Sequence, residues 1–446
     1  MFTSSSFFKI AVLGLVGLTW YGCGGSDGSG EGEAEAEAEA EAEAEAEAEA
    51  EGESPMVVAG YGHTCLLNVD AGTVRCWGDG TFGRLGYGNT DSIGDDETPA
   101  SVGDVDVGGT VVQLSSGYSH TCARLDTGAI RCWGSGSFGQ LGYANMTSIG
   151  DDETPASAGD VDVGGTAVQI EAGRAHTCAM LDTGDVRCWG NGGSGQLGYV
   201  NTDNIGDDET PASAGDVDIG GTVVELAPGA SHTCARLDTG AVRCWGAAGD
   251  GQLGYGNMIT IGDDETPASA GNVDVGGTVV QIAAHNSHNC ALLDTGTIRC
   301  WGYGEFGQLG YGNVNNIGDD ETPASVGDVT VGGTVAQLGP GEAETHTCAV
   351  LDTGAVRCWG TGIEGELGYA NTNVIGDDET PASAGDVDVG GTVVQLATGA
   401  YHTCAVLATD ALRCWGTGDV GQLGYGNTNH IGDDETPASA GDVPVF

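Results

Sequence analysis

The sequence predicts an all-β protein, a seven-bladed β-propeller built from seven repeats of about 56 residues, each with four antiparallel strands. Two recurring segments support this prediction. The segment Arg-Cys-Trp-Gly begins at residues 75, 131, 187, 243, 299, 357 and 413, and Ile-Gly-Asp-Asp-Glu-Thr-Pro begins at residues 93, 149, 205, 261, 317, 375 and 431. Successive copies are 56 residues apart, with one interval of 58, and no stretch shows a helical period. The predicted propeller spans residues 56–446.

One repeat shows how the four strands arise. Short runs rich in β-branched residues predict strands at residues 110–114, 120–125, 129–133 and 160–163. Asp126-Thr127-Gly128 predicts a three-residue hairpin loop, with glycine where a left-handed backbone is needed. A long loop rich in Gly, Asn and Asp then precedes the fourth strand. We expect the first and last strands of the chain to meet in one blade and so to close the ring.

Fourteen of the 15 cysteines form pairs, one pair in each repeat. In the predicted hairpin, Cys122 faces Cys132 at a non-hydrogen-bonded position, where Cα atoms approach to about 4.5 Å, a separation that a disulfide accepts. We therefore predict seven disulfides within hairpins: Cys65–Cys76, Cys122–Cys132, Cys178–Cys188, Cys234–Cys244, Cys290–Cys300, Cys348–Cys358 and Cys404–Cys414. Zinc is the alternative, but two facing cysteines supply only half of a zinc site, so no metal site is predicted.

The repeated motif resembles a known family. His-Thr-Cys-Ala-x-Leu-x-x-x-Gly-x-x-x-Cys-Trp-Gly followed by Gly-Gln-Leu-Gly is similar to the regulator-of-chromosome-condensation repeat, and the resemblance extends from Val57 to the end of the chain. It implies a seven-bladed propeller. It also implies two alternative functions, guanine-nucleotide exchange on a small GTPase and inhibition of an enzyme by a secreted propeller.

The N-terminal residues predict export. Lys9 precedes an apolar run over residues 10–20, too short to span a bilayer but typical of a signal peptide. Cys23 follows a small residue directly after this region, as at the cleavage site of bacterial lipoproteins. Residues 1–22 are therefore predicted to be a lipoprotein signal peptide with Cys23 as the lipidated residue; an ordinary signal peptide is the alternative. Residues 23–55 are rich in Glu and Ala and predict a disordered tether.

Charge limits the classes of partner. The chain has 12 basic and 65 acidic residues, a formal net charge of −53 at pH 7, and such a chain repels nucleic acid and anionic membranes. We expect contact with a membrane only through the lipid, and a partner with a basic patch. The Asp-Asp-Glu segments offer oxygen ligands, so structural calcium is an alternative to a role in the turns; no other cofactor is predicted. No catalytic grouping stands outside the repeat pattern, so we predict a monomer that is not an enzyme.

Comparison among the seven repeats indicates where binding is expected. The strands barely vary, whereas the stretches before His-x-Cys, after Cys-Trp-Gly and after Leu-Gly-Tyr-x-Asn differ between repeats. Because strands alternate in direction, these variable stretches leave one face and the uniform Asp-Thr-Gly turns leave the other. Variable loops on a fixed frame are typical of binding surfaces; drift in unconstrained loops is the alternative. The candidate binding residues are Tyr61, Phe82, Tyr118, Phe138, Arg174, Phe306 and Tyr401. The sequence thus favours a binding scaffold tethered to the bacterial cell envelope, with an unknown protein or envelope polymer as its ligand.

Intact mass of the mature protein from its native host tests the N-terminal and cysteine predictions together. We expect a lipid-sized increment on Cys23 and 14 cysteines that resist alkylation until they are reduced. Free thiols and an uncleaved N-terminus would instead place the chain inside the cell and would favour the GTPase alternative.

Overall fold

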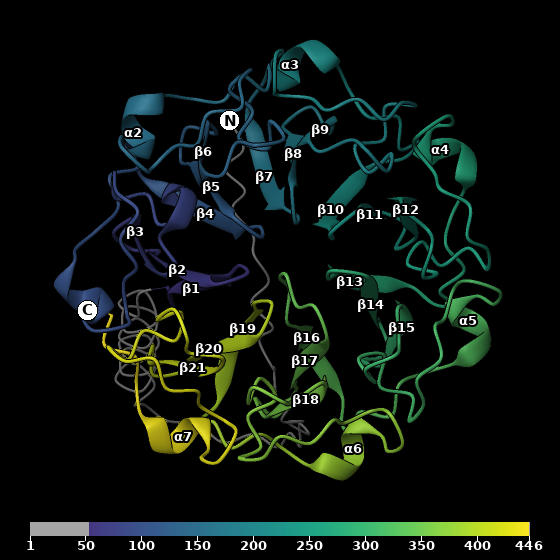
Figure 1. Cartoon of the computed structure of the whole chain (residues 1–446). Helices are drawn as coiled ribbons and strands as arrows, with labels where there is room; N and C mark the ends of the chain where they lie inside the picture. Colours follow the sequence, from purple (N-terminus) through teal and green to yellow (C-terminus); the bar gives the residue numbers. More distant parts are fainter. Residues whose placement is uncertain (1–52, 446) are drawn as a thin grey trace, which may run out of the picture. The chain divides into compact units, whose positions relative to one another are not determined.

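Seven sheets stand side by side in a ring, as the blades of a propeller (Figure 1). The structure, a computed structural model, describes residues 53–445, which lie in one compact unit. Each sheet has three antiparallel strands that pair in chain order. We number the blades 1 to 7 along the chain. The predicted signal peptide, Cys23 and nearly all of the predicted tether lie outside the described residues.

The strands have closely similar bounds from blade to blade. The first strands, nearest the centre, are β1 (Met56–Ala59), β4 (Val111–Ser116), β7 (Ala167–Ala172), β10 (Val223–Pro228), β13 (Val279–Ala284), β16 (Val335–Leu338) and β19 (Val393–Thr398). The second strands are β2 (His63–Asn68), β5 (His120–Leu125), β8 (His176–Leu181), β11 (His232–Leu237), β14 (His288–Leu293), β17 (His346–Leu351) and β20 (His402–Leu407). The third strands are β3 (Thr73–Gly78), β6 (Ile130–Gly134), β9 (Val186–Gly190), β12 (Val242–Gly246), β15 (Ile298–Gly302), β18 (Val356–Gly360) and β21 (Leu412–Gly416).

The hairpin of the second and third strands confirms the predicted register. Cys122 pairs with Cys132, and Gly128, with φ 81°, closes the turn by donating its N–H to the Leu125 carbonyl at 2.9 Å. The Cα atoms of each facing cysteine pair are 4.1 Å apart, and all seven predicted disulfides form. Disulfides persist in oxidising compartments, so the seven bonds indicate an oxidising, extracellular type of environment.

The predicted fourth strand does not form as a regular strand. In blade 2, Val161 donates one hydrogen bond to Ile130 of β6 at 2.9 Å. The next inward N–H, that of Val163, bonds the Val161 carbonyl of its own segment at 3.1 Å, so no ladder can extend. The same single contact recurs in every blade. The prediction of seven four-stranded sheets is therefore wrong by one strand per blade, because a local turn competes with sheet pairing for the same donor.

Short helical turns lie on the outer rim (Figure 1). Each rim turn starts at a proline that follows threonine, and proline suits a first helical position because its missing N–H has no partner to lose there. They are η2 (Pro99–Ser101), α2 (Pro155–Ala158), α3 (Pro211–Ala214), α4 (Pro267–Ala270), α5 (Pro323–Val326), α6 (Pro381–Ala384) and α7 (Pro437–Ala440), and one further turn, η1 (Thr81–Gly83), lies in blade 1. Over residues 53–445, no helix has the length and apolar character needed to cross a bilayer.

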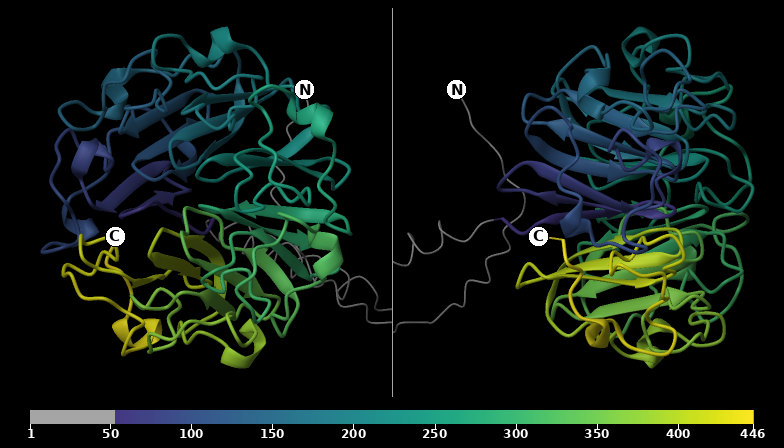
Figure 2. Two further views of the ribbon diagram at one scale, coloured as in Figure 1. Left: turned by 45° about the vertical axis from the view of Figure 1, so that its right-hand side comes forward. Right: turned by 60° about the vertical axis from the view of Figure 1, so that its left-hand side comes forward.

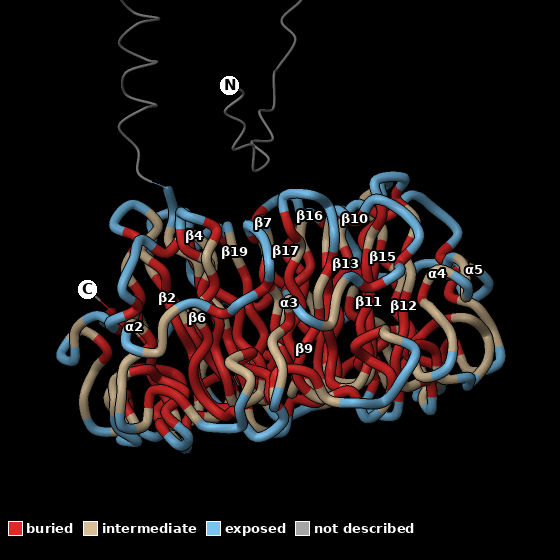
Figure 3. Tube along the Cα trace, turned by 90° about the horizontal axis from the view of Figure 1, so that it is seen from above, coloured by how far each residue is buried: buried red, intermediate tan, exposed pale blue. Residues whose placement is uncertain are grey.

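A tryptophan anchors each blade to the blade before it. The Trp133 indole is fully buried and donates Nε1–H to the Arg84 carbonyl of blade 1 at 3.0 Å. The other six tryptophans of the repeat make the same bond at 2.9–3.1 Å. Seen edge-on, the ring is a buried layer between two surfaces of exposed loops (Figure 3). The indole therefore supplies a large buried apolar surface and satisfies its only donor at the blade boundary.

A closed ring of histidine bonds runs through the same layer. The His120 Nε2 lies 2.9 Å from the Thr177 Oγ1 of the next blade, and Thr177 in turn donates to the Gln140 carbonyl at 2.9 Å. Because the threonine proton is committed to the carbonyl, we assign the imidazole proton to Nε2. Each ring histidine leaves a buried Nδ1 without a partner. The ring histidines are His63, His120, His176, His232, His288, His346 and His402, and an asparagine, Asn289, replaces threonine once.

The expectation that the terminal strands share one blade is wrong. β1 belongs to blade 1, whereas the C-terminal Val443 bonds Leu412 of β21 in blade 7 at 2.8 Å. The first blade, drawn in purple, lies beside the last, drawn in yellow (Figure 2). Trp77 Nε1 donates to the Gln422 carbonyl at 2.9 Å across this boundary, as the other tryptophans do elsewhere. The ring closes through the ordinary contact between blades, so no shared blade is needed.

Histidine titration tests this buried ring. Burial lowers the pKa of His120 to about 3 and that of His402 to about 4, and the other buried histidines shift in the same direction. For His430, partial burial lowers the pKa, but a hydrogen bond to Asp419 and the charges of Asp419 and Glu364 outweigh it and raise the pKa. By NMR we expect one of the nine imidazoles to titrate above its ordinary value, and eight not to move between about pH 8 and about pH 5.

These pKa shifts determine how the stability of the fold changes with pH. The folded-state pKa values lie below the ordinary histidine value of about 6.5, so the ring stabilises the fold fully above that pH and loses this contribution as the pH falls toward 4. Carboxyl groups act in the opposite sense, because burial raises the pKa of Glu171 to about 7. Thermal melting therefore reports a sum of both effects. Movement of several imidazole signals above about pH 5 would contradict the assigned role of the ring.

Candidate binding surface

Backbone contacts confirm that the loops divide between two faces. In blade 1 the loop between the first two strands is joined to the stretch after the third, because Asp79 donates its N–H to the Gly62 carbonyl at 2.8 Å. The hairpin turns lie at the opposite ends of the strands. Glu53, the first described residue, donates its N–H to Asp70 Oδ1 in such a turn at 3.2 Å. We call the two surfaces the loop face and the turn face; the chain enters the propeller on the turn face.

Four of the seven candidate binding residues meet at the centre of the loop face. Tyr61 and Tyr118, from blades 1 and 2, stack with ring centroids 4.0 Å apart. Tyr401 of blade 7 meets the Tyr61 ring edge-on at 5.7 Å. The Arg174 guanidinium of blade 3 lies over the Tyr118 ring, 4.2 Å from its centroid. Sequence positions up to 340 residues apart are thus brought into one group of three aromatic rings, with a cation on one of them.

Glu344 of blade 6 completes this group from the opposite side of the ring. Arg174 Nη1 lies 3.5 Å from Glu344 Oε1, and the Tyr401 hydroxyl donates to Glu344 Oε2. Blades 3 and 6 are not neighbours, so this ion pair crosses the propeller axis. We call Tyr61, Tyr118, Arg174, Glu344 and Tyr401 the axial cluster. Burial and the Tyr61 hydroxyl raise the pKa of Tyr118 to about 12, and burial and Glu344 raise the pKa of Tyr401, so both phenols are protonated at neutral pH.

The sequence prediction missed the acidic members of this region. Glu344 and the buried Glu342 lie in the blade whose repeat is two residues longer, and that longer interval was the available signal. Burial and the charge of Glu344 raise the pKa of Glu342 to about 8, although Arg174 lowers it. His285 of blade 5 was also missed; it is fully buried and stacks on His288 with centroids 4.5 Å apart. These residues make the centre of an otherwise repetitive ring asymmetric.

The three phenylalanines stand on a different set of loops from the residues of the axial cluster. Phe82, Phe138 and Phe306 come from blades 1, 2 and 5 and are 52%, 42% and 41% exposed. They sit on the loops that follow the third strands, on the same face as the cluster. The loop face therefore presents a central polar and aromatic cluster and separate exposed aromatic rings around it, a composition suited to binding another molecule.

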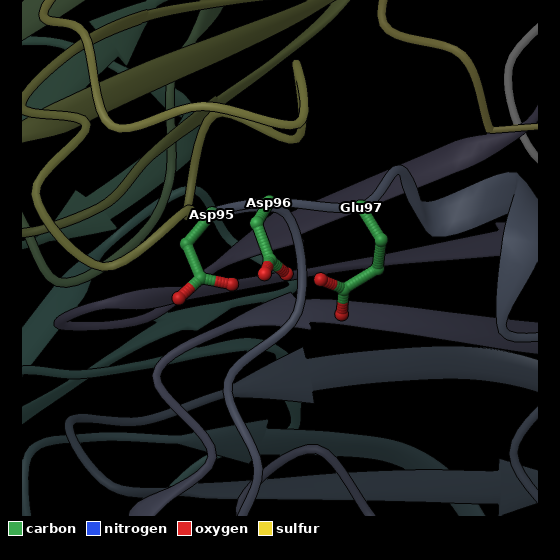
Figure 4. A group of neighbouring side chains, drawn as sticks. All are labelled: Asp95, Asp96 and Glu97. Carbon is green, nitrogen blue, oxygen red and sulfur yellow. The ribbon is translucent and has the colours of Figure 1, made fainter.

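The Asp-Asp-Glu segments form compact carboxylate groups. One carboxylate oxygen from each of Asp95, Asp96 and Glu97 lies within 4.8 Å of the other two, and the three side chains leave the same side of the loop (Figure 4). Burial, a hydrogen bond with Asp96 and the charges of Asp96 and Asp95 raise the pKa of Glu97 to about 7. A shared proton can therefore relieve the repulsion in each group near neutral pH. Calcium binding at these groups stays a prediction from the sequence.

The arginines of the described residues all have partners within the unit. Seven belong to the repeated Arg-Cys-Trp-Gly segment, and Arg131, for example, donates Nε–H to Asp160 at 2.9 Å. The others bond Asp79, Gln113, Glu225 or Glu344. The basic groups thus serve internal contacts, while many carboxylates face solvent. Such a surface can attract cationic and apolar groups and repels anions.

Removal of the Arg174 guanidinium tests the axial cluster. We expect Arg174→Ala to lower the free energy of unfolding by about 1–2 kcal/mol, because it removes one cation–π contact and one half-buried ion pair. Urea unfolding of Arg174→Ala, Glu344→Gln and the double variant gives the coupling between the two side chains. A coupling near zero would show that the ion pair across the axis does not form in solution.

Comparisons with known proteins bear on this fold. The family profile described as "RCC1-like domain" matches residues 17–342, and that of the "Regulator of chromosome condensation (RCC1) repeat" matches residues 393–422. The ultraviolet-B receptor UVR8 of Arabidopsis thaliana is 29% identical over 376 residues, which are 84% of this chain and 79% of the receptor. The probable E3 ubiquitin-protein ligase HERC4 of Homo sapiens is 30% identical over 357 residues, 80% of this chain but 31% of the ligase.

Solved structures show the same architecture. Yeast RCC1 (Prp20) in its complex with Kap60 has a TM-score of 0.63 at 18% identity over 85% of each chain. Human WBSCR16 has a TM-score of 0.60 at 22% identity over 79% of this chain and 86% of its own. At these identities the likeness supports the fold alone, whereas the family profile spans most of the sequence. The chain belongs to the RCC1-like domain family, and its seven blades form the propeller seen in those solved structures.

Proposed function

We propose that this protein is a surface-tethered binding scaffold, exported by a bacterium, that captures a protein or cell-envelope polymer on its loop face. The observation that supports this most directly is the difference between the two faces. The loop face gathers residues that differ between repeats around one axis, whereas the turn face repeats nearly the same hairpin turn. A rigid frame that holds variable loops is the usual arrangement of a binding site.

The entry point of the chain agrees with tethering. Glu53, near the end of the predicted tether of residues 23–55, bonds a turn-face residue, Asp70, so the tether would attach to the turn face. The loop face would then stay free for a partner. The seven disulfides support a compartment outside the reducing cytosol and so favour this function over nucleotide exchange on an intracellular GTPase. Enzyme inhibition would be one form of the same function, with an enzyme as the captured partner.

The charge distribution favours a basic partner. The arginines of the described unit are committed to internal contacts, and the formal net charge of the chain is −53. Attraction at a distance therefore operates on cations, and it weakens as salt screens the surface. A related propeller, Prp20p of Saccharomyces cerevisiae, has been characterised for its binding to Gsp1p and histones, so proteins of this fold do bind other proteins.

Cross-linking in the native host tests the proposed function. A photoreactive phenylalanine analogue replaces Phe138 on the loop face or, as a control, Thr239 in an exposed hairpin turn. We expect one protein or polymer to be captured at Phe138 and not at Thr239, and capture to fall at least about tenfold when Phe82 and Phe306 are both changed to Ala. Equal capture from both faces, or capture that ignores the two alanine substitutions, would contradict the proposal.

A further inference from the structure

The boundary of blades 4 and 5 on the loop face carries an aromatic corner next to carboxylates. The rings of Tyr303 and Phe306 meet edge-on, with centroids 5.8 Å apart and planes inclined by 72°. The Tyr303 hydroxyl donates to Glu305 Oε2 at 2.7 Å. Glu305 and Phe306 are exposed, so the corner is open to solvent.

Two further carboxylates adjoin this corner. Asp250 lies on the blade 4 loop that follows the third strand, as Glu305 does in blade 5. The neighbouring Gly251 packs closely on blade 5, because a Cβ added to it would lie 2.6 Å from the Asp319 backbone nitrogen. Burial and the charges of Glu305 and Asp319 raise the pKa of Asp250. The hydrogen bond to Glu305 is the main cause that raises the pKa of Tyr303 to about 12. Neighbouring carboxylates contribute to both pKa shifts, Glu305 and Asp319 to that of Asp250, and Glu305 and Asp250 to that of Tyr303.

Blade 1 shows which group fits this place in the repeat. There Asp79, Phe82 and Arg84 stand at the positions of Tyr303, Phe306 and Gln308. Arg84 Nη1 lies 3.1 Å from Asp79 Oδ2 in an ion pair, and its guanidinium carbon lies 5.8 Å from the Phe82 ring centroid. Blade 1 thus fills the corner with its own guanidinium. Blade 5 has the aromatic ring and more carboxylates, but the residue at the position of Arg84 is the uncharged Gln308.

Exposed apolar side chains lie on the loops of blades 4 and 5 that follow Leu-Gly-Tyr-Gly-Asn. Met258 and Ile259 of blade 4 are 62% and 65% exposed, and Val314 stands on the blade 5 loop that contacts Gly304 through its neighbour Asn315. Large aliphatic side chains with this exposure on one face of a protein are typical of an interaction surface. A partner on the loop face can cover these side chains with its own apolar residues.

We propose that the corner formed by Tyr303, Glu305 and Phe306, together with Asp250 and Asp319, receives an arginine side chain of the protein partner. The guanidinium stacks on the Phe306 ring and bonds the carboxylates, as Arg84 does within blade 1. This inference rests on the proposed function, because it specifies the chemistry that the captured partner presents.

The test uses two small probes and the full-length protein. Acetyl-Arg-Leu-amide and its uncharged isostere acetyl-citrulline-Leu-amide are titrated by saturation-transfer NMR. We expect the arginine probe to bind and the citrulline probe to bind at least about threefold more weakly. Glu305→Gln and Phe306→Ala should each weaken the arginine probe about three- to tenfold. The matched controls are Asp126→Asn, which removes one charge from the turn face, and Phe138→Ala, the equivalent ring of blade 2 beside Ser135 and Ser137.

A variant that fills the corner with a guanidinium of its own tests the proposal separately from any effect of the other variants on folding. Gln308→Arg places the blade 1 guanidinium in blade 5, at a position where Arg84 is already tolerated, and should abolish binding of the arginine probe. No binding at about 5 mM probe, equal binding of both probes, or effects of Glu305→Gln and Phe306→Ala no larger than those of their controls would overturn the proposal. The probes need no host partner, so failure here leaves the cross-linking result standing. Loss of partner capture with intact probe binding would contradict the proposed function instead.

Discussion

One backbone carbonyl at each blade boundary accepts hydrogen bonds from the next blade, and the ring depends on this contact. At the boundary of blades 2 and 3, the Gln140 carbonyl accepts from the Trp189 indole and from the Thr177 hydroxyl, both at 2.9 Å. His120 then donates to that same hydroxyl. All of these groups are fully buried, so an unmade bond would leave a buried polar atom without a partner. The contact therefore fixes how adjacent blades sit, seven times around the ring.

A repeated boundary leaves the loops free to differ. The position of every blade is set by the disulfide in its hairpin and by the tryptophan and histidine contacts with its neighbours. The loop residues therefore need not contribute to the stability of the ring. The axial cluster uses this freedom. Its residues stand at equivalent or adjacent loop positions, yet tyrosine, arginine and glutamate in different blades create one asymmetric group. The two extra residues of blade 6 carry Glu342 and Glu344 into the centre and add to that asymmetry.

The small number of arginines and the large number of carboxylates account for the interior ion pairs and for the kind of partner that we propose. The few cations of the described unit neutralise chosen carboxylates, such as Asp160 through Arg131, and the remaining acidic groups face solvent or share protons. Comparison of repeats is informative here, because the same backbone position holds an arginine in blade 1 and a glutamine in blade 5. A cation that one repeat supplies internally is the group that the other repeat is suited to accept from outside.

Much of this architecture was predictable because it depends on local spacing. The hairpin register followed from the turn at residues 126–128, since facing positions in a hairpin are fixed by the loop, and the cysteine pairing followed from the register. The fourth strand was predicted wrongly, because alternating valines also allow the local turn in which Val163 bonds Val161. The ring closure was also predicted wrongly, since no local pattern distinguishes a shared blade from two adjoining blades.

By itself, the sequence determined the seven repeats, the disulfides, the division into two faces and the residue types available for binding. The tertiary structure decided which of those residues meet. Tyr61 and Tyr401 are adjacent only because the last blade closes on the first, and Arg174 pairs with Glu344 only because the ring brings blades 3 and 6 to a common axis. Such contacts depend on the curvature summed over all blades, and no single repeat encodes that sum.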